Sequence, residues 1–213
     1  MRIFADKILT ALIVLMHETF GLSPNGISTL GFVIGLIAAV IVCTGHLGLG
    51  LAILALSQVV DGLDGGVARR YHLQSEEGER LDMMYDRINE LAIFLALAYI
   101  GSVSFLIAIL AFVAILLVTL IEPMSKFDPG FKRFILYFGY AATYFFHVNG
   151  MQLALNVVFF ANLSVFAVGT IIVDYRFQRE IDTQAMLRRE RENAMGLPQP
   201  PDDPPSFLSK LFS

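Results

Sequence analysis

Four aspartates in one short stretch of the chain are spaced so that two helices could carry them toward each other. Asp61 and Asp64 are three residues apart, and Asp82 and Asp86 are four residues apart. Side chains at these spacings lie on one side of a helix, so each pair can face the other. Unpaired acids close to hydrocarbon repel one another, and bound cations are the simplest way to neutralise them. We therefore expect a site for hard divalent ions, Mg²⁺ or Mn²⁺, and four carboxylates could share two ions.

Small and basic residues surround the aspartates. Gly65, Gly66 and Gly78 leave room for a ligand to approach the backbone. Arg69 can donate two hydrogen bonds to one phosphate group. Because divalent ions bind and polarise phosphate oxygens, a diphosphate suits such a site better than a neutral substrate. An acceptor hydroxyl would need a base, and Asp86 could take its proton.

The composition indicates that the helices carrying these residues lie in a membrane. Of the 213 residues, 56% are hydrophobic and 16% are charged, and the mean hydropathy is +0.66. A spanning helix needs about 20 mostly apolar residues, and the first is expected to begin with Ser23 as its N-cap and Pro24 as its first residue. We predict an all-α integral membrane protein with six transmembrane helices, at 27–43, 47–60, 78–100, 103–121, 131–148 and 151–173. The second and third helices would bring their polar ends together at one membrane face.

The basic residues all fall on one side of this arrangement. The connections at 44–46, 101–102 and 147–150 contain no Lys or Arg, whereas all 15 basic residues lie on the other side. Because cytoplasmic loops retain basic residues, we expect both termini and the polar active site to face the cytoplasm. The formal net charge of -4 gives no indication of a nucleic-acid partner.

The chain divides into three parts by composition. Residues 1–22 contain an apolar run, 8–16, that is too short to span and is expected to form an N-terminal helix in the membrane interface. Residues 23–173 form the six-helix catalytic part. Residues 174–213 are expected to continue as a charged cytoplasmic helix that ends before Pro198 and is followed by a flexible proline-rich tail.

The aspartates belong to a longer pattern that resembles the signature of the CDP-alcohol phosphotransferases. The matching residues, with the spacing of that signature, are Asp61, Asp64, Gly65, Ala68, Arg69, Gly78, Asp82 and Asp86. The Ser23-Pro24-Asn25 start of the first helix and the six predicted spans also resemble this family, so the resemblance covers residues 8–173. It implies a metal-dependent transferase of phospholipid biosynthesis. An alcohol would attack the phosphorus next to the lipid or alcohol of a CDP-linked donor and release CMP.

The resemblance also implies a role for each matching residue. The residues expected to bind metal are Asp61, Asp64, Asp82 and Asp86, of which Asp86 could be a ligand, the catalytic base or both. The residues expected to hold the CDP moiety are Gly65, Ala68, Arg69 and Gly78. Members of the family commonly form homodimers through their membrane helices, so a homodimer is expected here.

The acceptor is indicated by basic residues close to the aspartates. Arg87, directly after Asp86, resembles the branch of the family that uses inositol phosphate. A phosphorylated acceptor would need cations near the metals, and the candidates lie in the loop before the fifth span: Lys126, Lys132 and Arg133. We expect a phosphatidyl group to be transferred to a sugar-alcohol phosphate such as inositol phosphate. Glycerol phosphate as acceptor, a soluble CDP-alcohol as donor, and simple anchoring of the loop by its charges are the alternatives.

Three other interpretations fit part of the pattern. The acids could form solvated salt bridges with the neighbouring arginines Arg69, Arg70, Arg80 and Arg87. An intramembrane prenyltransferase also uses aspartate-bound Mg²⁺ and a diphosphate, but it lacks the Ala-Arg and glycine spacing. An acid-lined cation transporter would carry its acids near the middle of the bilayer, on broken helices.

Overall fold

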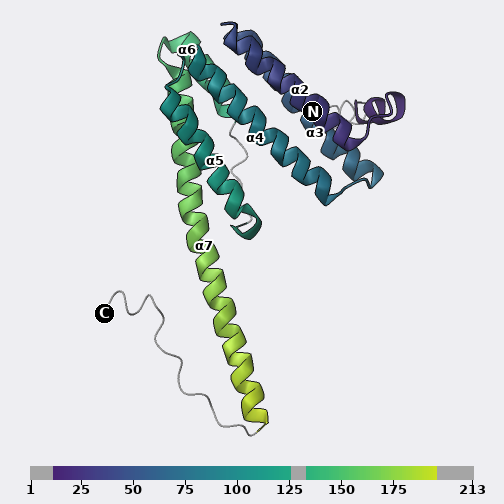
Figure 1. Ribbon diagram of the computed structural model, residues 1–213, viewed down its shortest axis with the longest axis vertical. Coiled ribbons are helices and arrows are strands. Elements are labelled where there is room, and N and C mark those ends of the chain that lie inside the picture. The colour runs from purple at the N-terminus through teal and green to yellow at the C-terminus, as the bar shows by residue number, and fades with distance from the viewer. Residues whose placement is uncertain (1–11, 126–132, 196–213) are drawn as a thin grey trace.

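The structure, a computed structural model, describes residues 12–125 and 133–195 of the chain. Every regular element in these residues is helical (Figure 1). A short π-helical turn, η1 (Leu15–Thr19), precedes the helices α2 (Pro24–Cys43), α3 (Leu47–Tyr71), α4 (Glu76–Tyr99), α5 (Phe105–Ser125), α6 (Phe134–Phe146) and α7 (Gly150–Ala194). The prediction of an all-α fold is confirmed for the described residues.

Helices α2 and α4 begin at serine N-caps. The Ser23 hydroxyl accepts a hydrogen bond from the Gly26 N–H at 3.2 Å, and Pro24 is the first helical residue, as predicted. The Ser75 hydroxyl accepts from the Gly78 N–H at 3.1 Å, and three glutamates follow in the first turn of α4. Both the caps and the acidic first turn complement the unpaired N–H groups of a helix N-terminus. The start of α4 is therefore fixed next to the end of α3.

Helix α2 packs against both α3 and α4 through glycines four residues apart. A Cβ on Gly31 would lie 3.3 Å from the backbone nitrogen of Asp61, and one on Gly35 would lie 2.5 Å from the amide nitrogen of Asn89. The Ser57 hydroxyl donates a hydrogen bond to the Gly31 carbonyl oxygen at 2.8 Å. Small residues let membrane helices approach closely and hydrogen-bond across the contact. These contacts set the distances between the helices that carry the aspartates.

Helix α7 packs against α5 and α6, and the contact between α4 and α5 joins this group to α2, α3 and α4 (Figure 1). One apolar core runs through both groups. Its largest fully buried side chains include Leu54, Phe94, Leu97, Ile115, Leu136 and Leu155. A smaller core around Ile13 holds the N-terminal segment against α2 and α3, and the Tyr71 hydroxyl adds a hydrogen bond to Glu18 at 2.6 Å.

Within residues 12–125 and 133–195, three helices are long and apolar enough to cross a membrane, judged by length and composition: Pro24–Cys43, Leu47–Tyr71 and Gly150–Arg191. Two shorter apolar stretches, Phe105–Ile121 and Phe134–Phe146, lie in α5 and α6. Helix α4 carries a charged N-terminal half, so its apolar part is also short. The six spans and their orientation stay predictions.

Some helix bounds differ from those expected. Helix α7 has 45 residues, about 68 Å at 1.5 Å per residue, and continues without a break past position 173, as expected for the charged helix that follows the last predicted span. Its second half extends beyond the other described helices (Figure 1), and it ends before Pro198, as predicted. Helix α6 is shorter than the predicted span 131–148, because His147 adopts a left-handed conformation with φ 53°. Of the expected interfacial helix, residues 12–16 are helical and the rest lies outside the described residues.

Candidate active site

Three of the four aspartates converge between α3 and α4. One carboxylate oxygen from each of Asp61, Asp64 and Asp82 lies within 4.8 Å of the other two. We call these three residues the aspartate triad. Asp61 and Asp64 come from α3, and Asp82 comes from the second turn of α4. The spacing within each helix predicts that the acids of the two helices face each other, and three of the four lie close together.

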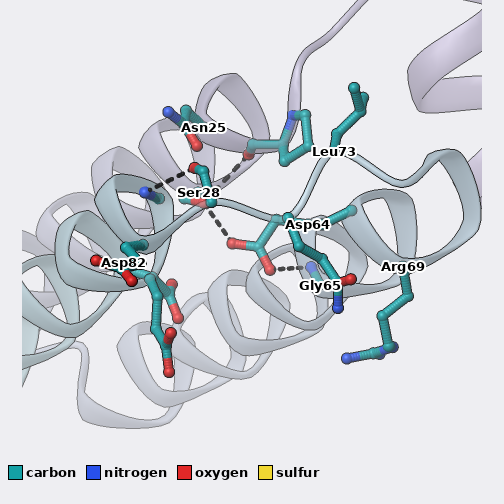
Figure 2. A pocket seen from close by; sticks show the side chains of 14 residues that line it. Asn25, Ser28, Asp64, Gly65, Arg69, Leu73 and Asp82 are labelled. Atoms are coloured by element: carbon teal, nitrogen blue, oxygen red, sulfur yellow. Dashed lines mark hydrogen bonds between the residues drawn. The ribbon is translucent and has the colours of Figure 1, made fainter.

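The carboxylate of Asp64 is held by two donors. The Ser28 hydroxyl of α2 donates to Asp64 Oδ2, and the Gly65 backbone N–H donates to Oδ1 (Figure 2). The hydroxyl of Ser28 also lies 3.1 Å from the Pro24 carbonyl oxygen. Hydrogen bonds of this kind orient a metal-binding carboxylate before the metal arrives. Sequence reasoning missed Ser28, although a serine on the first predicted helix near its polar end is a signal for such a contact.

The aspartate triad has the oxygen ligands and the uncompensated negative charge that a divalent cation requires. Among the described residues, Asp82 Oδ1 is buried and has no hydrogen-bond partner. No ion pair in the described part of the chain joins Asp61, Asp64 or Asp82 to an arginine. A buried carboxylate oxygen without a donor is unfavourable unless a ligand completes it. Oxygen ligands alone suit Mg²⁺ or Mn²⁺, so the residues fit the expected metal.

Asp86 lies apart from the aspartate triad and pairs with Arg133. The Arg133 Nη2 donates to Asp86 Oδ1, and the Arg133 Nε lies 3.8 Å from Glu90 Oε1. Arg87 Nη1 in turn donates to the other Glu90 oxygen at 2.5 Å. The expected basic residue Arg133 is therefore next to the fourth aspartate. The other two, Lys126 and Lys132, lie outside the described residues.

Among the described residues, no ion pair joins any of the four aspartates to Arg69, Arg70, Arg80 or Arg87, so the alternative of solvated salt bridges is not supported. Arg80 pairs with Glu76 at 3.8 Å, and both side chains are largely exposed. Arg87 forms a buried pair with Glu90 instead of a solvated one. Because these pairs leave the aspartate triad untouched, they do not explain why three acids lie together.

A cavity of about 540 Å³ opens beside the aspartate triad. Its lining contains all four residues expected to hold CDP, which are Gly65, Ala68, Arg69 and Gly78. Residues from the start of α2 complete the lining, including Asn25 and Ser28 (Figure 2). Four of the lining residues are acidic, Asp64, Glu76, Glu79 and Asp82, and one is an arginine. An anionic diphosphate could enter this cavity only with cations to offset the acids.

The glycines of the motif have different surroundings. Gly65 lies under the Arg69 side chain, where a Cβ would be 3.3 Å from Nη1, and Gly78 lies against Asn25, where a Cβ would be 2.9 Å from Oδ1. Both face the cavity. A Cβ on Gly66 would lie 2.6 Å from the Ile13 side chain, and Gly66 is not among the lining residues. The expectation that Gly66 makes room for a ligand is therefore wrong, because this glycine makes room for the N-terminal segment.

Comparison with known proteins gives the family. The family model for CDP-alcohol phosphatidyltransferase matches residues 21–173. The structure resembles the crystal structure of Mycobacterium tuberculosis phosphatidylinositol phosphate synthase with CDP-DAG bound, at 18% identity and a TM-score of 0.68, covering 78% of this chain and 94% of that chain. The same synthase in complex with manganese and citrate gives a TM-score of 0.66 at 18% identity, covering 76% and 87% of the two chains.

A curated relative is the inner membrane protein YnjF of Escherichia coli (strain K12). It is 36% identical over 66 residues, which are 31% of this chain and 32% of YnjF, so the match spans about a third of that protein. The apolar helices and this membrane relative indicate an integral membrane protein. With a family match over more than half of its length, the chain belongs to the CDP-alcohol phosphatidyltransferase family.

Proposed function

We propose that this transferase moves a phosphatidyl group from a CDP-linked lipid to the hydroxyl of an acceptor and releases CMP. The observation that carries the proposal is the aspartate triad, with ligand oxygens within 4.8 Å of one another, two of whose members, Asp64 and Asp82, line a cavity together with Arg69. Family membership supports the transfer reaction. The bound CDP-DAG and the manganese of the similar synthase structures support the class of donor and metal.

Each residue of the site has a proposed role. The aspartate triad binds Mg²⁺ or Mn²⁺, and when bound, the cations neutralise the acids and polarise the diphosphate. Arg69, which also lines the cavity, donates hydrogen bonds to a phosphate oxygen. Gly65, Ala68 and Gly78 are small, so the nucleotide can lie against the backbone of α3 and α4. Two ions with Asp86 as a further ligand are the proposed full set.

Asp86 is the proposed base for the acceptor. Its carboxylate takes the proton of the acceptor hydroxyl while the hydroxyl oxygen bonds to the lipid-side phosphorus, and the bond from that phosphorus to the CMP oxygen breaks. Arg133 at Asp86 supports an acceptor that carries a phosphate of its own. We take a sugar-alcohol phosphate such as inositol phosphate as the first candidate. Glycerol phosphate is the second, and a soluble CDP-alcohol is the alternative donor.

The membrane arrangement proposed for this activity has six spans, both termini in the cytoplasm and two copies of the chain. The absence of Lys and Arg from the connections at 44–46, 101–102 and 147–150 supports this orientation. Residues 1–22 would lie at the interface, 23–173 would be catalytic, and 174–213 would be cytoplasmic. The packing of Ile13 against Gly66 supports a peripheral N-terminal segment.

The experiment that tests the function is CMP release by the purified protein with Mg²⁺ and CDP-diacylglycerol. Inositol phosphate, glycerol phosphate, serine and inositol are offered separately. Asp86→Asn should abolish release, and Asp182→Asn, an exposed change on α7, should leave it intact. CMP formed with one acceptor identifies that acceptor. No CMP with any of them rejects the diacylglycerol donor, and cation uptake into proteoliposomes without CMP release would favour the transporter.

A further inference from the structure

A row of alternating charges, buried at Glu90 and Arg133, starts at Asp86, which is one helical turn along α4 from Asp82 of the aspartate triad. Arg87, Glu90, Arg133 and Asp86 follow one another in this row, linked by the contacts of Arg87 and Arg133 described above. The side chains of Glu90 and Arg133 are 3% and 9% exposed. Glu90 therefore lies deeper than the triad-facing part of α4, at the point where an apolar run begins. A carboxylate buried to this degree needs a defined role for its charge.

The Arg133 guanidinium lies between two carboxylates of one helix. Asp86 and Glu90 are four residues apart, so they occupy the same side of α4, one turn from each other. Nη2 of the guanidinium is bonded to Asp86, and Nε is 3.8 Å from Glu90 Oε1. A guanidinium has five donors in a planar fork, so a small rotation exchanges one carboxylate for the other. In either position the buried positive charge keeps a counter-ion.

We propose that Glu90 is a positioning residue, which holds the Arg133 guanidinium when a divalent cation binds Asp86. The inference rests on the proposed function, in which Asp86 is a metal ligand. Arg133 and the cation then compete for the same carboxylate. Glu90 lowers the free-energy cost of their exchange, because the Arg133 guanidinium released from Asp86 still has a carboxylate partner in its buried surroundings. Released from Asp86, the guanidinium stays beside the site and is available to a phosphorylated acceptor.

The proposal predicts opposite effects for two substitutions. Arg133→Gln removes the competing cation, so Mn²⁺ should bind about tenfold more tightly, equivalent to about 1.4 kcal/mol. Glu90→Gln removes the alternative carboxylate, so Arg133 stays on Asp86 and Mn²⁺ should bind about tenfold more weakly. A purely structural role predicts weaker binding in both variants, since each would loosen the contact between α4 and α6. Opposite changes in Mn²⁺ affinity in the two variants therefore distinguish a positioning role of Glu90 from a purely structural one.

The test is a Mn²⁺ titration of the purified full chain in detergent, followed by the electron paramagnetic resonance signal of free Mn²⁺. The matched control is Arg80→Gln, which breaks the exposed pair with Glu76 and should leave Mn²⁺ affinity unchanged. If Arg133→Gln does not yield folded protein, Arg133→Lys replaces it. Lysine keeps the positive charge but lacks the planar guanidinium. The Arg133→Lys protein should therefore bind Mn²⁺ more tightly than the wild type and less tightly than expected for Arg133→Gln.

Asp82→Asn distinguishes failure of this inference from failure of the proposed function. If Asp82→Asn lowers Mn²⁺ affinity while the Arg133 and Glu90 variants match the wild type, the metal site stands and the positioning role of Glu90 is rejected. Weaker binding in both the Arg133 and Glu90 variants also rejects it. If Asp82→Asn leaves Mn²⁺ binding unchanged, the metal site itself is wrong, and the proposed function fails with it.

Discussion

Neutralising Asp82 should stabilise the metal-free protein, because the aspartate triad concentrates negative charge. The ligand oxygens of its three residues lie within 4.8 Å of one another. At that separation and an effective dielectric constant of about 20, two unit negative charges repel by about 3.5 kcal/mol. Asp82 takes part in two such pairs, and its buried Oδ1 has no hydrogen-bond partner among the described residues.

Proton uptake and solvent relieve most of this repulsion, so we expect Asp82→Asn to increase the free energy of unfolding by about 1–3 kcal/mol. For a chain of this length, 1 kcal/mol corresponds to about 2–4 °C in melting temperature. The assay is thermal unfolding of the purified protein in detergent, first with EDTA and then with Mn²⁺. The variant should melt above the wild type in EDTA. Mn²⁺ should raise the melting temperature of the wild type and have little effect on the variant, which lacks a ligand.

Asp182→Asn, an exposed change on α7, is the matched control and should alter stability by less than about 0.5 kcal/mol. If Asp82→Asn melts below the wild type in EDTA, Asp82 supports the fold and our account of the charge repulsion is refuted. If Mn²⁺ stabilises the variant as much as the wild type, Asp82 is not a metal ligand.

Two further predictions concern the helix contacts that hold the site. Gly150→Ala should destabilise the protein by about 1–3 kcal/mol, because its Cβ would lie 2.2 Å from a backbone carbonyl oxygen of α6. Gly62→Ala, with no atom within 4 Å, should be neutral or stabilising by up to about 1 kcal/mol, and equal melting temperatures of the two variants would contradict the close contact. Ser28→Ala should weaken Mn²⁺ binding about tenfold, because Asp64 loses the hydroxyl that orients it. Thr29→Ala removes a neighbouring hydroxyl as a control, and Mn²⁺ titrations that coincide for both variants would show that Asp64 is oriented without Ser28.

The aspartate triad could be predicted from the sequence because it depends on spacing within single helices. Asp61 and Asp64 are separated by three residues, which fixes their common side whatever surrounds them. The loop between α3 and α4 is short, so the helix ends that carry the acids lie near each other, and α2 packs against both helices. The part of the cavity lining that α3 and α4 contribute follows from the same local geometry, whereas Asn25 and Ser28 come from α2. A prediction from periodicity is reliable where the interacting residues lie close together along the chain.

The pairing of Asp86 could not be predicted in this way. Its partner Arg133 is 47 residues further along the chain, and periodicity says nothing about contacts at that distance. The sequence does indicate that Glu90 has a charge partner. Glu90 is the last acid before an apolar run, and an acid at such a depth in a membrane helix needs a partner. The sequence does not reveal which cation that partner is. For the same reason, Gly66 could not be told apart from Gly65, because its neighbour Ile13 comes from a distant segment.

The continuity of α7 shows that a change in composition need not end a helix. Hydrophobic residues give way to charged ones near position 173, yet the helix continues to Ala194. The charged stretch is rich in Arg, Glu, Gln and Ala, which are strong helix formers, and contains neither Gly nor Pro. The hydropathy of a segment indicates whether lipid or water surrounds it, whereas the helix propensity of its residues decides where the helix ends. Position 173 therefore marks where α7 passes from an apolar to a charged stretch, and the helix itself does not end there.

The close approach of α2 to α3 connects the fold to the chemistry. Ser57, four residues before Asp61 on α3, bonds to the Gly31 carbonyl oxygen of α2. Asp64, three residues after Asp61, accepts a hydrogen bond from Ser28 of α2. The helix turn that carries Asp61 is therefore held on both sides by α2, and Gly31 permits the contact. Mg²⁺ demands near-ideal octahedral geometry, which rigid helices provide better than loops. A side chain larger than glycine at position 31 would separate the two helices and so disturb metal binding without touching any ligand.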